Sequence, residues 1–174
     1  MLYLQIWKAV ISLEQEIASV IKFILDVSGN PAPYYWEMEQ DFIVPAIYFP
    51  PPLIESDGHT FDKYSLSFSW YIKFFHSDTT SAHFMCQKAL AAIQGRRCYI
   101  PLIDEKGNLT KHAFRLKDPK MRGVDDGAVQ LTLMWDSPRA YFVKPRDSYK
   151  KVEEFDILIN EAFSDALKLL DEGE

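Results

Sequence analysis

The chain has 174 residues, of which 48% are hydrophobic and 14% aromatic, so it can build a hydrophobic core and is not disordered as a whole. Its length fits one domain with an appended arm. Its net charge of −6 excludes a general nucleic-acid-binding protein, which needs a basic surface.

The cysteine content and the start of the chain indicate a cytosolic protein. Cys86 and Cys98 do not make a disulfide framework. The first residues lack the basic region, apolar run and cleavage site of a signal peptide. No apolar run reaches the roughly 20 residues that a membrane span needs. We therefore expect a protein that is made and used in a reducing cytosol and has no membrane partner.

The first part of the chain is predicted to hold one helix and two strands. Residues 2–26 carry apolar side chains every three or four positions, which indicates an amphipathic helix that packs on a core. Strands are predicted at residues 33–40 and 43–49, and Pro45 favours an edge position or a bulge in the second one. Residues 53–60 contain Ser56-Asp57-Gly58, so we expect a loop or hairpin tip there.

The centre of the chain is predicted to be a long strand that leads directly into a helix. Residues 61–76 alternate large apolar side chains with serines, a pattern typical of an antiparallel sheet with helices on one side. From Thr79 to Gln94 the apolar spacing becomes helical, and the thiol of Cys86 falls on the buried side. Asp78 and the two threonines after it are candidate N-caps.

Three more strands and a last helix are predicted in the C-terminal half. The strands cover residues 98–103, 110–116 and 128–136, and Lys117–Gly127 is expected to be a charged loop. After a polar linker, apolar residues from Phe155 to Leu170 recur at helical spacing. This helix either folds back on its own domain or reaches a neighbouring molecule.

The pattern as a whole predicts an α+β fold. It has a mostly antiparallel or mixed sheet with helices packed on one face, and an appended C-terminal helix. The predicted domains are residues 1–137, and residues 138–174 as linker and helix.

The charges are unevenly distributed along the chain. Residues 26–62 hold seven acidic side chains and no lysine or arginine, whereas residues 96–122 hold eight basic side chains against three acidic ones. One interpretation is two solvated loop faces. The other is that the acidic and basic segments meet across a subunit boundary, because complementary patches select partners in assemblies.

No motif for catalysis or cofactor binding occurs. The four histidines have no spacing that a zinc site would use, and the predicted burial of Cys86 argues against a catalytic thiol. The glycine-rich signatures of nucleotide sites and the nucleophile elbow are missing. Arg96-Arg97 and the basic residues from Lys111 to Arg122 lack interleaved exposed aromatics, so sequence-specific nucleic-acid binding is not expected. We expect no cofactor, no metal and no enzymatic activity.

The order of elements over residues 2–137 resembles the tail terminator, or tail-completion, proteins of tailed bacteriophages and prophage particles. The resemblance lies in the N-terminal helix leading to Pro33-Tyr34-Tyr35-Trp36 and the apolar strand Val44–Phe49. It also lies in the serine and aromatic strand Tyr64–Phe75 with its following helix, and in the closing strand Ala128–Trp135. It implies an α+β structural protein that forms a hexameric ring on the tail tube. Such a ring ends tube polymerisation and docks the head connector.

The resemblance also implies partners and a location. The partners are other copies of this chain, the tail tube protein and the head-completion or connector protein, and the location is the virion tail, assembled in the host cytoplasm. A ring requires head-to-tail contacts between two different surfaces. The candidate interface residues are Glu37, Glu39, Asp41, Arg96, Arg97, Arg115, Lys117, Lys120 and Arg122, with Tyr71 and Phe75 on the second face of the long strand.

Two other functions remain open from the sequence alone. One is another phage neck, tube or baseplate component. The other is a small ligand-binding or enzymatic α+β domain whose site no motif reveals.

Overall fold

The computed structural model describes residues 13–38 and 41–141. The chain divides into two compact units, Met1–Ala140 and Tyr141–Glu174. The first residues of the predicted N-terminal helix, Glu39, and the predicted linker and C-terminal helix from residue 142 onward lie outside the described residues. The structure below is that of the first unit.

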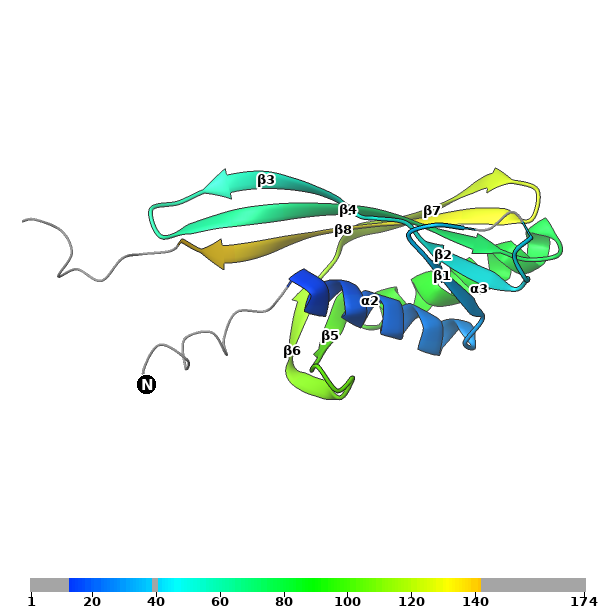
Figure 1. Cartoon of the computed structure of the whole chain (residues 1–174), viewed down its shortest axis with the longest axis horizontal. Coiled ribbons are helices and arrows are strands. Elements are labelled where there is room, and N and C mark those ends of the chain that lie inside the picture. Colours follow the sequence, from blue (N-terminus) through cyan, green and yellow to red (C-terminus); the bar gives the residue numbers. More distant parts are fainter. Residues whose placement is uncertain (1–12, 39–40, 142–174) are drawn as a thin grey trace, which may run out of the picture. The chain divides into compact units, whose positions relative to one another are not determined.

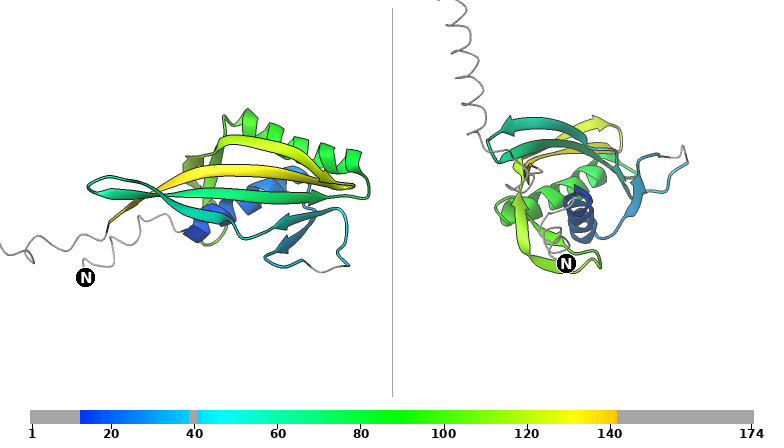
Figure 2. Two further views of the ribbon diagram at one scale, coloured as in Figure 1. Left: turned by 90° about the horizontal axis from the view of Figure 1, so that it is seen from above. Right: turned by 60° about the vertical axis from the view of Figure 1, so that its left-hand side comes forward.

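Two helices pack on one face of a sheet, which confirms the predicted α+β class (Figures 1 and 2). Helix α2 spans Leu13–Ser28, so it ends two residues later than predicted. Helix α3 spans Thr79–Gly95 and is capped by Asp78, whose Oδ1 accepts a hydrogen bond of 2.8 Å from the backbone N–H of Ser81.

The main sheet has the strand order β1-β2-β4-β8-β7, with β3 added on the same side of β4 as β2. Strands β1 and β2 are parallel, and the other pairs are antiparallel, so the sheet is mixed. The strands are β1 Ala32–Tyr35, β2 Ala46–Phe49, β3 Leu53–His59, β4 Lys63–Phe75, β7 Lys117–Asp125 and β8 Ala128–Ala140.

The long central strand is confirmed as β4, and it forms the axis of the sheet with β8. All thirteen residues of β4 pair with all thirteen of β8, from Lys63 opposite Ala140 to Phe75 opposite Ala128. Their helix-facing side chains fill the core, and the rings of Phe68 and Trp135 stack at 4.5 Å with 7° between their planes. The fully buried members of this face are Phe68, Trp70, Ile72, Phe74, Val129, Leu131, Leu133 and Trp135.

A separate two-stranded sheet, β5 (Tyr99–Ile103) and β6 (Leu109–Arg115), packs beside α2. Two polar side chains of α2 form hydrogen bonds with the backbone of Ile103, the last residue of β5. Gln15 donates a 2.7 Å hydrogen bond to the carbonyl of Ile103, and the Ser19 hydroxyl accepts a 3.0 Å bond from the N–H of the same residue. These bonds satisfy buried backbone groups, so they fix the helix against this small sheet.

Two segments predicted as loops are strands in the structure. Residues 53–59 form β3 on the N-terminal half of β4, with a register shift between Asp57 and His59. Residues 117–125 form β7 on β8, with a shift between Lys117 and Lys120. Both were predicted wrongly because their polar residues and glycines favour loops in isolation. Pairing with a long neighbouring strand outweighs that local preference.

Other predicted boundaries were too wide or too narrow. The strand predicted at 33–40 stops at Tyr35, because Trp36 takes a left-handed conformation with φ of 63°. The strand predicted at 43–49 begins only after Pro45, and it lies between β1 and β4, so the predicted edge position is wrong. The last strand runs on to Ala140 because β4 extends far enough to pair with it.

Candidate subunit interface

The main sheet has one face that no described helix covers, here called the open face (Figure 1). Residues directly opposite each other in antiparallel strands share a face. Tyr71 and Phe75 of β4 therefore share the open face with Thr132 and Ala128 of β8. Tyr71 is 43% exposed, whereas the ring of Phe42 lies 4.9 Å from that of Phe75 and half-buries it.

Three of the predicted basic residues lie together on the open face. Lys117, Lys120 and Arg122 of β7 stand opposite Met134, Thr132 and Gln130 of β8, and all three are exposed. We call these three residues the basic strip. The ammonium group of Lys117 forms an ion pair with Asp136, which also accepts a 3.2 Å hydrogen bond from Ser67. Lys120 and Arg122 extend the positive charge along the strip.

Acidic residues of β3 lie on the same open face at the opposite edge of the sheet. Glu55 and Asp57 stand opposite Ser67 and Ser65 of β4, and both are exposed. We call them the acidic strip. Among the described residues, β3 pairs with β4 alone and β7 with β8 alone, so each strand has a free outer edge. The sheet thus carries opposite charges at its two edges.

The remaining predicted interface residues lie elsewhere in the unit. Arg96 follows α3, and its guanidinium lies 5.5 Å from the ring centre of Phe23, while Arg97 is exposed beside it. Arg115 ends β6, and its guanidinium lies 6.0 Å from the ring centre of Tyr99. The predicted basic segment is therefore divided between the open face and the helix side.

The predicted acidic cluster is also divided. Glu37 and Asp41 are exposed on the connection between β1 and β2, and Glu39 is outside the described residues. They are separated from the acidic strip on β3 by the whole of β2 in the chain. Sequence reasoning missed the acidic strip as a site because it assigned residues 53–60 to a loop, where side chains have no fixed face.

The turn between β3 and β4 follows directly on the hairpin tip predicted at residues 53–60, but its fully exposed aromatic side chain, Phe61, was missed. Hydrogen bonds shape this turn: Thr60 donates its N–H to the carbonyl of Lys63 at 2.7 Å, and its hydroxyl contacts Asp62 at 3.0 Å. We call Thr60–Asp62 the tip. The position of Phe61 between the polar residues Thr60 and Asp62 could have indicated an exposed turn. The alternation of apolar and polar residues instead placed Phe61 in the predicted strand 61–76.

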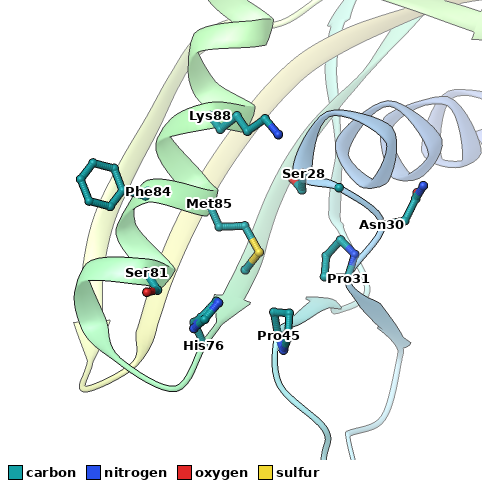
Figure 3. Close-up of a pocket in the computed structure, with 10 residues that line it drawn as sticks. Ser28, Asn30, Pro31, Pro45, His76, Ser81, Phe84, Met85 and Lys88 are labelled. Atoms are coloured by element: carbon teal, nitrogen blue, oxygen red, sulfur yellow. The ribbon is translucent and has the colours of Figure 1, made fainter.

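A pocket of about 350 Å³ lies between the end of α2 and the first turns of α3 (Figure 3). Its apolar lining comes from Pro31, Pro45 and Met85, and Lys88 and His76 add basic groups. His76 Nδ1 accepts a hydrogen bond of 2.9 Å from the N–H of Ser77 and lies 3.8 Å from a carboxylate oxygen of Asp78. We call this the α2–α3 pocket.

The described residues offer little for catalysis. Among them, no three histidine, cysteine, aspartate or glutamate side chains gather where they could hold a metal ion. Cys86 is completely buried, as predicted, and burial raises the pKa of its thiol to about 12. A thiol with that pKa stays protonated at neutral pH and is a poor nucleophile.

In the described part of the chain, no helix is long and apolar enough to cross a membrane. The candidate site consists of the exposed surfaces described above: the two charged strips, the tip and the α2–α3 pocket. Surfaces of this kind suit contacts between proteins.

Comparison with known proteins finds two similar bacterial sequences. The chain is 29% identical over 143 residues to the uncharacterized protein YqbJ of Bacillus subtilis, covering 82% of this chain and 95% of that protein. It is also 29% identical over 132 residues to the phage-like element PBSX protein XkdJ of the same organism, covering 76% of this chain and 89% of that protein.

No family model matches the chain. Among solved structures, a chain of the virion of a native gene transfer agent particle aligns with a TM-score of 0.43 and 12% identity, covering 72% of this chain and 94% of that chain. Along most of its length, the chain is therefore similar in sequence to a protein of a phage-like element.

Proposed function

We propose that this chain is the ring-forming subunit of a phage tail terminator. It is a structural protein without catalytic activity, and it acts in the tail of a phage or phage-like particle that is assembled in the host cytoplasm. Its ring caps the tail tube, ends tube polymerisation and docks the head connector. The observation that carries the proposal is the sequence similarity to XkdJ, which spans 89% of that phage-like element protein.

The arrangement of charges supports a ring. A closed ring of identical subunits needs two different surfaces that fit each other, because each subunit contacts the next head to tail. The acidic strip on β3 and the basic strip on β7 lie on one face at opposite edges of the sheet. When copies stand side by side in one orientation, the acidic strip of one meets the basic strip of the next.

The free strand edges support the same contact. An outer edge carries a row of backbone N–H and C=O groups that can pair with another strand. Both charged strips lie on strands of this kind, and Leu53 and Ile54 of β3 are 51% and 38% exposed. A neighbouring subunit that covers this edge buries both apolar side chains as well as the charges, and this adds to the stability of the ring.

Tube assembly tests the proposal. The tail tube protein encoded by the same phage-like element is polymerised in vitro, with and without the purified full-length chain, and imaged by negative-stain electron microscopy. A tail terminator shortens the tubes and marks one end of each with a ring. Decoration along the tube wall, or tubes of unchanged length without a cap, would refute this function and favour another tail component.

A further inference from the structure

We infer that the acidic C-terminal segment of one copy docks on the β5–β6 sheet of a neighbouring copy. The segment comprises residues 153–174, which lie outside the described residues, so it enters here through its sequence alone. The contact rests on the proposed ring, and it uses a surface that the two charged strips do not include.

The β5–β6 sheet has one buried face and one exposed face. Ile100 and Phe114 stand opposite each other on the buried face, where the ring of Phe114 lies 5.6 Å from that of Trp135. The exposed face, here called the outer face, carries Tyr99, Pro101, Ala113 and Arg115. Tyr99 is 47% exposed, and Leu109 at the start of β6 is 69% exposed. A two-stranded sheet is only marginally stable by itself, so a segment that covers the outer face stabilises it.

The outer face is basic. Arg115 is exposed, with its guanidinium 6.0 Å from the ring centre of Tyr99, and Lys111 is exposed on the same strand. The acidic residues of this hairpin, Asp104 and Glu105, lie in the turn at its other end. There the carboxylate of Asp104 accepts two backbone hydrogen bonds of the turn, at 2.9 and 2.8 Å. The outer face therefore combines exposed apolar groups with a net positive charge.

The C-terminal segment has the complementary properties. Residues 153–174 contain eight aspartates and glutamates and one basic residue, Lys168. The apolar residues of the segment recur every three or four positions, which predicts an amphipathic helix with one apolar side. Helices of this kind dock their apolar side on an exposed apolar surface, and charges at the margins set their orientation. The basic strip of β7 is a poorer match, because the proposed ring sets it against the acidic strip of a neighbouring copy.

The linker is long enough for a contact between copies. Thirteen residues, 142–154, separate the last described residue, Tyr141, from Phe155. Extended, this linker spans up to about 45 Å, which is about the full length of the thirteen-residue strand β4. The segment can therefore pass the edge of its own domain and reach a copy in contact with it. Because each copy offers one segment and one outer face, exchange around a closed ring leaves neither surface unpaired and adds a second link between neighbours.

Crosslinking between two differently tagged full-length copies tests the contact. One copy carries Ala113→Cys on the outer face and the other carries Ala166→Cys in the segment, both with Cys98→Ser, so that the buried Cys86 is the remaining native thiol. The two copies are co-expressed, purified through both tags and treated with a short bismaleimide. We expect a crosslinked heterodimer from this pair, and none when Ala91→Cys, at an exposed alanine of α3, replaces Ala113→Cys. A single chain that carries both cysteines and crosslinks only within itself, with no heterodimer from the pair, would overturn docking between copies.

A charge reversal supplies an independent measurement. Arg115→Glu in the copy with Ala113→Cys is expected to slow formation of the heterodimer by about fivefold or more, whereas Lys106→Glu in the β5–β6 turn leaves the rate unchanged. Equal rates in the two variants would overturn the contact. A ring that forms while no heterodimer appears overturns this contact and leaves the proposed function standing. A wild-type chain that stays monomeric at every concentration overturns both.

Discussion

The indole Nε1–H of Trp135 donates a hydrogen bond of 2.9 Å to Oε2 of Glu16, which ties helix α2 to the central strand β8 inside the core. The other carboxylate oxygen, Oε1, accepts a 2.6 Å bond from Ser137 and lies 3.4 Å from a guanidinium nitrogen of Arg139. Glu16 and Arg139 are both at least nine-tenths buried. The burial of this carboxylate is tolerated because both its oxygens accept hydrogen bonds and one lies beside a positive charge. All three partners come from one face of β8.

Replacing this carboxylate is predicted to destabilise the domain strongly. Glu16→Ala leaves the charge of Arg139 buried without its partner, and such losses cost about 3–5 kcal/mol. Glu16→Gln keeps an acceptor for Trp135 and is expected to cost less. Urea unfolding followed by tryptophan fluorescence measures both. Glu14→Gln on the exposed side of the same helix is the control, and equal stability of the Glu14 and Glu16 variants would contradict this account.

Gly127 is predicted to tolerate no side chain. It has φ of 70° in the turn between β7 and β8, and an added Cβ would lie 2.7 Å from the carbonyl oxygen of His76. Gly127→Ala should therefore cost more than about 1 kcal/mol in unfolding free energy. Gly107→Ala is the matched control, because Gly107 has φ of 78° but an added Cβ there meets no atom within 4 Å. Thermal unfolding of both variants makes the comparison, and a similar loss in both would rule out the clash.

Asp78 is predicted to make the stability of α3 depend on pH. Its hydrogen bonds with Ser81 lower the pKa of the carboxyl group below the ordinary value of 3.8. A lowered pKa stabilises the fold above the ordinary value, and the contribution is lost as the pH falls through the folded-state pKa. Asp78→Ala should therefore lower the melting temperature at pH 7, and this deficit should shrink as the pH falls below 3.8.

Asp78→Asn separates the cap from the charge. Asparagine caps helices about as well as aspartate, so this variant should stay close to the wild type at pH 7 and lose the pH-dependent part. Calorimetry between pH 2.5 and 7 measures the melting temperatures of the wild type and both Asp78 variants. A constant difference between wild type and Asp78→Ala across that range would show that the carboxylate charge plays no part.

Charge reversal on the basic residues is predicted to weaken the ring. Lys117→Glu places a carboxylate in the basic strip, where it repels the neighbour's acidic strip and its own Asp136. Arg115→Glu tests the basic residue on the helix side, which was predicted at the same interface. Lys106→Glu in the β5–β6 turn is the matched control. Light scattering measures the oligomer mass, and an unchanged mass in the Lys117 variant would exclude the basic strip from the interface.

Alternation and helical spacing predicted the central part of this fold well. The strand at Lys63–Phe75 and the helix after it were foreseen because each buries one strongly apolar face, which leaves a clear period in the sequence. The cap at Asp78 and the burial of Cys86 followed from the same pattern.

The edges of the sheet could not be predicted in this way. Strands β3 and β7 carry mostly charged residues on their open side and contain Gly58 or Gly123, so their identity depends on the partner strand and not on their own residues. The basic and acidic strips were therefore recognised as charged segments, but their common face emerges only from the register with β4 and β8. The role of Glu16 was missed because a glutamate on a helix is usually exposed.

Native mass spectrometry of the purified full-length chain tests the ring most directly. The account predicts a dominant species of about six times the 20.2 kDa chain, which loses subunits when Lys117→Glu is introduced. A species of 20.2 kDa at every concentration, in the presence and absence of the tail tube protein, would contradict it.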